Sequence, residues 1–386
     1  MIMWMNGKVK KMIAWILVIA MILSVLVMAT SVFAAGETFV SEKNEMMSFS
    51  IEEAMAYAKE HNYDLLSSQL DKDNIELSKK ITEDLQDTLK DTYSLTKGAG
   101  DNFDTYKVRN GYAVMATKSA EKMLDAANTF KQKTTEMAVL SAYYALSEAT
   151  MLLEQKKDTL KLISDQVKVC EDKLALGNVS ELVYKTASLE KIGAEMAVTS
   201  AQADYDKALM SFNKILALPL DGKVTLTSKT SYEQYTLPDY DKKLEERKLE
   251  DLTYAQLLSD KELVEKEQRM AQTYYGARAP EYKQVVNKAK KNDISIEKQK
   301  AEIEYSLKAD IKNIDVLQKS IKASQASIVL SNIILDITKV KNSLGMATEL
   351  DVISAELDVE SAQIKYIQAI HGYNTVILMF EKNIVG

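Results

Sequence analysis

The fold is decided by a stretch of sequence that occurs twice. Residues 176–216 read LGNVSELVYKTASLEKIGAEMAVTSAQADYDKALMSFNKIL, and residues 344–384 read LGMATELDVISAELDVESAQIKYIQAIHGYNTVILMFEKNI. They align without a gap at a constant numbering offset of 168. Identical pairs include a glycine and two aromatic positions: Gly177/Gly345, Tyr205/Tyr373 and Phe212/Phe380. Helical composition alone does not produce such identities, so the stretch indicates an internal duplication.

The earlier parts of the two copies match more weakly. Residues 51–53 (IEE) align with residues 244–246 (LEE) at an offset of 193. Because this offset exceeds 168, we expect about 25 additional residues in the first copy. The glycine-containing stretch Lys97–Gly111 is the expected place, since the second copy has only a short break at residues 275–280.

Between these breaks the apolar residues have helical spacing. They alternate steps of 3 and 4 at Leu160, Ile163, Val167, Cys170 and Leu174, and again at Leu350, Ile353, Leu357, Glu360 and Ile364, where Glu360 is the single polar member. This spacing predicts seams between helices packed as in a coiled coil. The predicted helices cover about residues 50–61, 63–95, 112–176, 181–217, 241–274, 281–343 and 349–384.

Each repeated stretch begins with a predicted tight turn. Gly177 and Asn178 can adopt the left-handed conformation that ends a helix, and Ser180 then caps the next one. Gly345 and Thr348 predict the same turn in the second copy. The fold class is therefore all-α, with elongated tandem helical hairpins and little or no β-structure.

The predicted organisation has five parts. They are a signal peptide (1–34), an N-terminal tail (35–49), a first helical repeat (50–217), a linker (218–240) with a short β-like run at Val224–Leu226, and a second helical repeat (241–386). The signal has a basic start, an apolar run from Met12 to about Thr30, and a small-residue cleavage site at Val32–Ala34. An uncleaved membrane anchor is the alternative, because the run approaches the length that spans a bilayer.

Charge and composition exclude several classes of function. Loss of residues 1–34 would take the formal charge from −7 to −10, since three lysines and no acidic residue lie there. An acidic protein of this kind is a poor ligand for nucleic acid. Cys170 is the only cysteine, and His61 and His371 are isolated histidines. We find no metal-ligand spacing, nucleophile–base set or phosphate loop, and predict a non-enzyme without cofactors.

With these features the chain resembles the TolC family of outer-membrane efflux channels. The resemblance rests on SIEEAMAYAKEHNYDLL (residues 50–66) and on the Gly-x-x-Ser/Thr turn that occurs twice. It implies a homotrimeric α-helical barrel that binds a periplasmic adaptor protein and an inner-membrane exporter. The implied adaptor-docking turns contain Gly177, Asn178 and Ser180 in the first copy, and Gly345 and Thr348 in the second. Asp351 matches an inward-facing aspartate at the channel entrance.

Some features depart from the family. A second entrance aspartate is replaced by Ser354, and the first-copy position that matches Asp351 is Val183. The Tyr and Arg that hold the entrance closed in the family correspond to Val340 and Ala347. A membrane strand needs about 9–11 residues with an apolar face, and Lys97–Gly111 offers neither the length nor the face for two strands. We therefore expect a variant whose transmembrane β-barrel strands are reduced or missing.

The resulting functional hypothesis is an exported component of an efflux or secretion system that forms a conduit or docking sleeve. The expected location is the cell envelope: the outer membrane if the source has one, otherwise the outer face of the cytoplasmic membrane. One alternative is an envelope structural coiled-coil protein without transport activity. A secreted pore-former is a third hypothesis, but it requires an apolar insertion segment that the sequence after the signal lacks.

Overall fold

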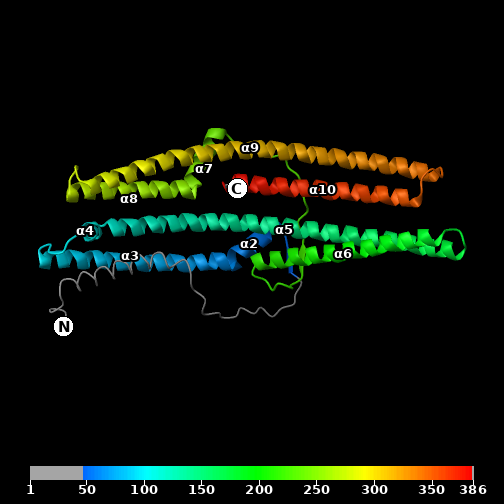
Figure 1. The fold of residues 1–386 in the computed structure, drawn as a ribbon, viewed down its shortest axis with the longest axis horizontal. Coiled ribbons are helices and arrows are strands. Elements are labelled where there is room, and N and C mark those ends of the chain that lie inside the picture. The colour runs from blue at the N-terminus through cyan, green and yellow to red at the C-terminus, as the bar shows by residue number, and fades with distance from the viewer. Residues whose placement is uncertain (1–46, 385–386) are drawn as a thin grey trace. The chain divides into compact units, whose positions relative to one another are not determined.

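The computed structural model describes residues 47–384, which belong to one compact unit and are almost entirely helical (Figure 1). The elements are β1 (Met47–Phe49), α2 (Ile51–His61), α3 (Tyr63–Thr96), α4 (Phe103–Arg109), α5 (Tyr112–Ala175), α6 (Glu181–Ile215), β2 (Val224–Leu226), α7 (Tyr240–Glu250), α8 (Leu252–Tyr275), α9 (Pro280–Ser343) and α10 (Glu349–Glu381). The expected signal peptide, residues 1–34, lies outside the described residues.

The two longest helices have matching bounds. α5 and α9 each contain 64 residues, which corresponds to a length of about 96 Å at 1.5 Å per residue. α9 begins and ends 168 residues after α5, which is the same offset that relates the two copies of the repeated sequence. The all-α prediction and most predicted helix bounds are confirmed to within two or three residues.

The prediction of one continuous helix over residues 241–274 is wrong. The chain breaks at Asp251, whose backbone is extended at φ −72° and ψ 116°. The Asp251 carboxylate accepts a hydrogen bond from the backbone N–H of Tyr254 (2.6 Å) and so caps α8. Asn62 separates α2 from α3 in the same way, with its side-chain oxygen accepting from Asp64 N (3.0 Å).

These joints also correct the alignment of the early parts. α2 and α7 each span 11 residues, and both of their ends are related by a numbering offset of 189. The sequence alignment at an offset of 193 was therefore wrong by four positions, about one helical turn. A shift of one turn preserves the spacing of a helical face, so sequence periodicity could not detect it.

The expected N-terminal tail ends in a strand that the sequence did not predict. β1 pairs with β2 in parallel, with Met47 opposite Val224 and Phe49 opposite Leu226. Tyr143 of α5 fixes this strand pair, because its hydroxyl donates to Phe49 O (3.1 Å) and accepts from Ser228 N (2.8 Å). A three-residue strand has too little periodicity to be recognised in isolation.

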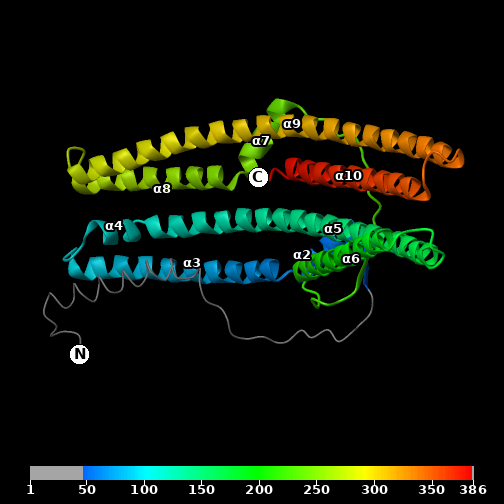
Figure 2. The same cartoon turned by 45° about the vertical axis from the view of Figure 1, so that its right-hand side comes forward.

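The helices lie side by side in a fixed order (Figures 1 and 2). α3 and α6 follow each other along one edge and pack on α5. α5 also contacts α8 and α10, and these two helices pack on α9, which forms the opposite edge. The short helix α4 fills the stretch between α3 and α5, where the sequence predicted only a break.

Two hydrophobic clusters form the core. One joins β1, α2, α5 and α6 around Phe49, Tyr143 and Phe212, and the other joins α9 and α10 around Ile314, Tyr373 and Phe380. The aligned pair Phe212 and Phe380 is fully buried in both places.

The predicted apolar seam of α10 is only partly buried. Alanine and valine positions carry the tight packing instead, at Ala355, Val359 and Ala362. Leu350 is 51% exposed, while Ile353 and Leu357 are half-buried. Small side chains allow two helix backbones to approach closely, so the larger apolar residues point partly outward. In α5 the seam residues, Cys170 among them, are likewise half-buried.

Candidate functional site

The two glycine turns have the same backbone geometry. Gly177 and Gly345 adopt left-handed conformations, with φ of +73° and +74°. In the first turn the N–H of Asn178 donates to Lys173 O (2.8 Å), and in the second the N–H of Met346 donates to Lys341 O (2.8 Å). Each glycine N–H bonds the carbonyl three residues earlier at 2.9 Å, so both turns are Schellman motifs. The predicted helix ends are confirmed.

The predicted caps of the following helices are also present. Ser180 Oγ accepts from Val183 N (3.4 Å), and Thr348 Oγ1 accepts from Asp351 N (3.2 Å). In the second turn the Asp351 carboxylate accepts two hydrogen bonds from Thr348, one from its backbone N–H and one from its hydroxyl, at 2.7 Å each. These bonds, the backbone one first, lower the pKa of Asp351. Val183 cannot complete such a capping box in the first turn.

Asp351 therefore has a structural role whatever else it does. Its carboxylate is exposed and fixed at the start of α10, where the helix dipole favours a negative charge. The two positions that match the family's entrance Tyr and Arg differ in exposure: Val340 is 59% exposed and Ala347 is half-buried. Neither side chain can form a charged or hydrogen-bonded clamp.

Exposed apolar side chains surround both turns, a feature that the sequence analysis missed. Leu176 is 75% exposed and Leu344 is 67% exposed, each directly before its glycine. Leu182 and Met346 are 74% and 76% exposed. Isolated exposed apolar residues are ordinary, but a group at a helix tip suits a protein contact. The leucines at aligned positions were visible in the sequence, but their exposure depends on the neighbouring helices.

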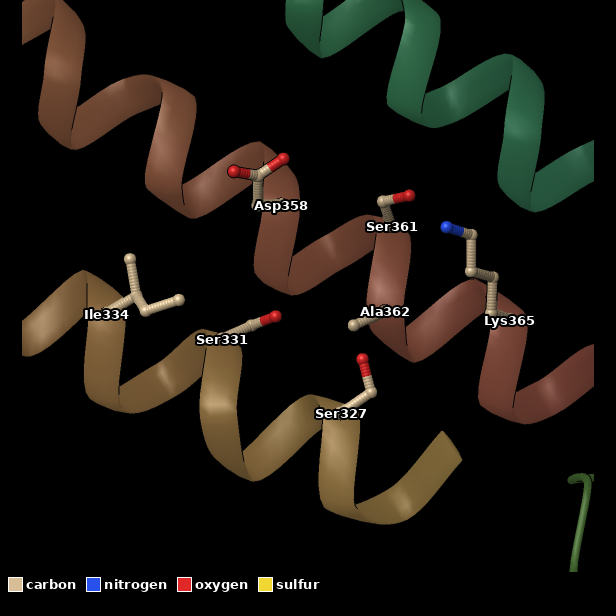
Figure 3. Close-up of a pocket in the computed structure, with 7 residues that line it drawn as sticks. All are labelled: Ser327, Ser331, Ile334, Asp358, Ser361, Ala362 and Lys365. Carbon is tan, nitrogen blue, oxygen red and sulfur yellow. The ribbon is translucent and has the colours of Figure 1, made fainter. Parts of the chain in front are cut away.

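Metal-ligating side chains and surface hollows are the other candidate features of the described chain. Residues 47–384 contain no group of three His, Cys, Asp or Glu side chains placed to hold a metal ion. A hollow of about 210 Å³ between α9 and α10 is lined by Ser327, Ser331, Ile334, Asp358, Ser361, Ala362 and Lys365 (Figure 3). These mostly polar residues line an open groove, and they include no histidine or cysteine that could activate the hydroxyls.

The two histidines have different surroundings. His61 is exposed and stacks on Tyr57 at 4.0 Å. His371 is buried, with Nδ1 2.7 Å from Glu148 Oε1 and Nε2 2.7 Å from Thr230 Oγ1. It therefore joins α10 to α5 and to the linker, an arrangement that satisfies both ring nitrogens structurally.

Comparison with known proteins identifies the fold. The sequence matches no protein-family model and no curated protein. The structure resembles CusC, described for transmembrane channel formation, at 12% identity and a TM-score of 0.64, covering 92% of this chain and 96% of CusC. It resembles the outer membrane protein VceC of Vibrio cholerae at 13% identity and a TM-score of 0.61, covering 87% and 96%.

The outer membrane channel CmeC of Campylobacter jejuni gives a similar result. Its TM-score is 0.62 at 12% identity, and the match covers 92% of this chain and 93% of CmeC. The likeness extends over nearly the full length of each protein. The chain therefore has the TolC-type fold of these outer membrane channels, as the sequence predicted.

Proposed function

We propose that this chain is an exported TolC-like component of an efflux or secretion system. Its copies would form a helical conduit or docking sleeve that works with an adaptor protein and a membrane transporter. The fold likeness supports the general role, and the edges of the helical layer, which no other helix of residues 47–384 covers, support assembly from several copies. The edges are the observation that carries the proposal.

Both edges of the layer expose apolar stripes at helical spacing. Along α9 the stripe contains Leu330, Ile333, Ile337 and Val340, which are 50–59% exposed. Along the opposite edge it contains Tyr63, Leu66, Leu70, Leu77 and Ile81 of α3, and Leu182, Leu189, Ile192 and Met196 of α6. Continuous exposed stripes are uncommon on monomeric proteins and mark surfaces that bind a partner.

The helices at the two edges have net charges of opposite sign. α9 contains 12 lysines and 8 carboxylates, whereas α3 contains 4 lysines and 8 carboxylates. α6 is slightly acidic, with 4 lysines and 5 carboxylates. A basic edge that fits an acidic edge favours a head-to-tail contact between copies and disfavours the contact of like edges. Head-to-tail contacts close into a ring when the rotation between copies permits.

A homotrimer is the closed ring that we propose, as the family resemblance implies. In such a ring the glycine turns of all copies would lie at one end. The exposed Leu176 and Leu344 would then be repeated around the rim, together with the turn residues Gly177, Asn178, Ser180, Gly345 and Thr348. This rim is the proposed adaptor-docking surface. Asp351, fixed at the start of α10, would place a ring of carboxylates beside it at the conduit entrance.

The same proposal includes the organisation of the chain. Two duplicated helical repeats, residues 50–217 and 241–386, would each supply one hairpin wall, and residues 218–240 would connect them. A signal peptide at residues 1–34 would direct export to the cell envelope. Among the helices of residues 47–384, none has an apolar stretch of the length needed to span a bilayer.

The turn surface gives the test of the transport role. Leu176→Asp combined with Leu344→Asp changes two highly exposed side chains, so folding and self-assembly are expected to remain. The variant should lose the proposed complex with an adaptor protein from the same source, measured by native mass spectrometry of the two purified proteins. Export through the system should fail in parallel. The structural coiled-coil alternative predicts no adaptor complex for the parent protein and unchanged export when the chain is deleted.

A further inference from the structure

The end of the unit remote from the glycine turns carries a cluster of aromatic side chains, here called the aromatic end. It contains Tyr93, Phe103, Tyr106, Tyr274 and Tyr275, from α3, α4 and α8. Ring centroids lie 4.9 Å apart for Phe103 and Tyr275, and 5.2 Å apart for Tyr106 and Tyr274. These residues lie at or near the ends of their helices.

The cluster is only partly covered. Tyr93, Tyr274 and Tyr275 are 42%, 38% and 37% exposed, and Leu95 beside them is 85% exposed. Core aromatic residues such as Tyr143 and Tyr373 are almost fully buried, at 2% and 1%. The aromatic end therefore presents ring surface and hydroxyl groups to the surroundings together, which suits a boundary between an apolar and a polar phase.

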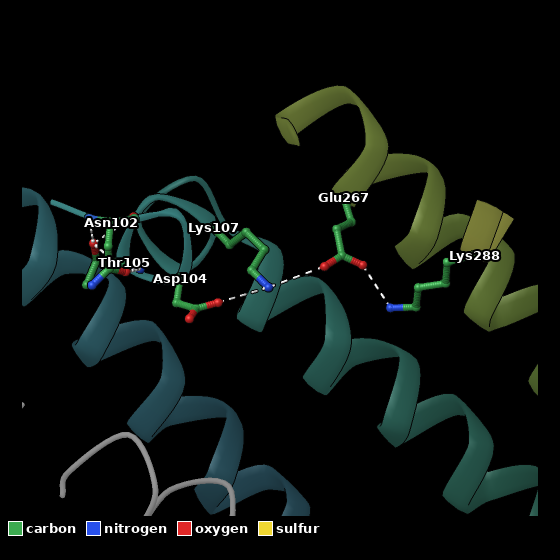
Figure 4. A network of polar contacts seen from close by, with 6 residues as sticks. All are labelled: Asn102, Asp104, Thr105, Lys107, Glu267 and Lys288. Carbon is green, nitrogen blue, oxygen red and sulfur yellow. Dashed lines mark hydrogen bonds and ion pairs between the residues drawn. The ribbon is translucent and has the colours of Figure 1, made fainter. Parts of the chain in front are cut away.

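A network of ion pairs holds α4 in place beneath this surface. Lys107 Nζ lies 3.2 Å from Asp104 Oδ1 and 3.3 Å from Glu267 Oε1, and Lys288 Nζ lies 2.8 Å from Glu267 Oε2 (Figure 4). Arg109 is also fixed, since it pairs with Asp101 at 3.0 Å and its guanidinium lies 3.4 Å from the centroid of the Tyr93 ring. The aromatic side chains are thus presented on a fixed support.

The remaining charge at this end is basic. Residues 93–111 and 274–283 contain five cations and three carboxylates: Lys97, Lys107, Arg109, Arg278 and Lys283 against Asp101, Asp104 and Glu281. Two of the carboxylates are neutralised by Lys107 and Arg109. Lys97, Arg278 and Lys283 are exposed and form no ion pair within the described residues. Within the two stretches counted above, Glu281 is the one carboxylate without such a pair, and Asp91, just outside them, is an exposed carboxylate that also has none among the described residues.

We propose that the aromatic end docks on the headgroup region of an anionic lipid bilayer. Tyrosine is enriched at membrane interfaces, and lysine and arginine are attracted by anionic headgroups. The formal charge of the whole chain is −7, which would oppose such binding if charge acted over long distances. Salt screens exposed charges beyond about 8–10 Å, so the carboxylates along helices of about 96 Å have little effect at the end. The proposal does not depend on the transport role.

A site-specific fluorescence measurement tests the proposal. Both native tryptophans, Trp4 and Trp15, lie in the proposed signal peptide, so the chain purified after its removal carries none, and Tyr275→Trp then places a single probe at the aromatic end. We expect brominated lipids to quench this probe in phosphatidylglycerol vesicles and not in phosphatidylcholine vesicles. The matched control is Tyr305→Trp in the middle of α9, at a side chain that is 69% exposed, where no quenching is expected. Circular dichroism confirms folding, and Tyr274→Trp replaces Tyr275→Trp if the latter does not fold.

Charge variants separate local from general attraction. Lys97→Glu, Arg278→Glu and Lys283→Glu together should weaken vesicle binding by at least about 100-fold, since each cation at an anionic surface contributes about a fivefold factor. The control triple Lys161→Glu, Lys168→Glu and Lys322→Glu makes the same change of net charge at exposed remote sites and should leave binding within about twofold. Equal loss in both triples, absence of quenching at residue 275, or binding to purified cell-wall polymer in place of vesicles would overturn the proposal.

Discussion

The apolar stripe of α9 gives the prediction with the most direct energetic consequence. Ile333 and Ile337 are 51% and 50% exposed, so about half of each side chain is still available for burial. Complete burial of an isoleucine side chain contributes about 1.5–3 kcal/mol, so each would contribute about 1 kcal/mol on contact with a second copy. Replacing both by asparagine, Ile333→Asn with Ile337→Asn, should weaken each contact by about 2 kcal/mol, a factor of about 30 in Kd.

Sedimentation equilibrium on the purified protein measures this change. The dissociation constant between copies should rise by about 30-fold, while thermal unfolding of the separated chain should shift little, because both positions are half-exposed. Leu249→Asn on α7 is the control, since Leu249 is 82% exposed and lies off both stripes. If the double variant associates as strongly as the parent at equal stability, the stripe is not an interface and the energetic reasoning above is refuted.

Four further predictions concern single positions and salt. Gly345→Ala should destabilise the chain by about 1–2 kcal/mol through backbone strain alone, since φ is +74° and a Cβ would meet no atom within 4 Å; a chemical denaturation midpoint equal to that of the parent would contradict this. Burial, and secondarily the charge of Asp158, raises the pKa of Glu360. The native chain therefore binds more protons than the unfolded chain, and stability falls as the pH rises from the unfolded pKa of this carboxyl to its raised native pKa. Glu360→Gln should raise the Tm at neutral pH and not below about pH 4, whereas a Tm gain independent of pH would argue against this explanation. Asp310→Ala leaves the fully buried Arg247 guanidinium without its 2.7 Å partner and should cost about 3 kcal/mol in urea unfolding, an account that a loss below about 1 kcal/mol would exclude. Raising NaCl from about 0.05 to about 0.5 M should weaken association between copies, because the edges are oppositely charged, and stronger association in salt would speak against charge-paired edges.

The sequence was sufficient for the features that depend on local spacing. Alternating steps of 3 and 4 predicted the long helices, and Gly177 and Gly345 predicted their ends because glycine adopts the left-handed turn conformation without a steric penalty. Ser180 and Thr348 were recognised as caps from their position before an apolar run. These signals act within one or two helical turns, so no knowledge of the neighbouring helices is required.

Features that depend on neighbours were missed. The break at Asp251 follows from a side-chain bond to Tyr254 N, which competes with a helical pattern that otherwise continues through it. The strand β1 exists because β2, which lies far along the chain beyond α6, pairs with it. The charges of α3 and α9 could be counted in the sequence, but their meaning became clear only when the structure placed these helices at opposite edges of one layer.

Heterologous contact between the α6 and α9 edges is the central claim, and disulfide cross-linking tests it most directly. In a Cys170→Ser background, Met196→Cys and Leu330→Cys introduce thiols at similar distances from the glycine-turn ends of α6 and α9, at side chains that are 69% and 58% exposed. Within one chain these positions lie on opposite edges, so a bond between them must join two copies. We predict that oxidation of the double variant gives a ladder ending in a closed covalent trimer, and that neither single variant cross-links. Dimers formed by either cysteine alone, or a double variant that remains monomeric, would contradict the account.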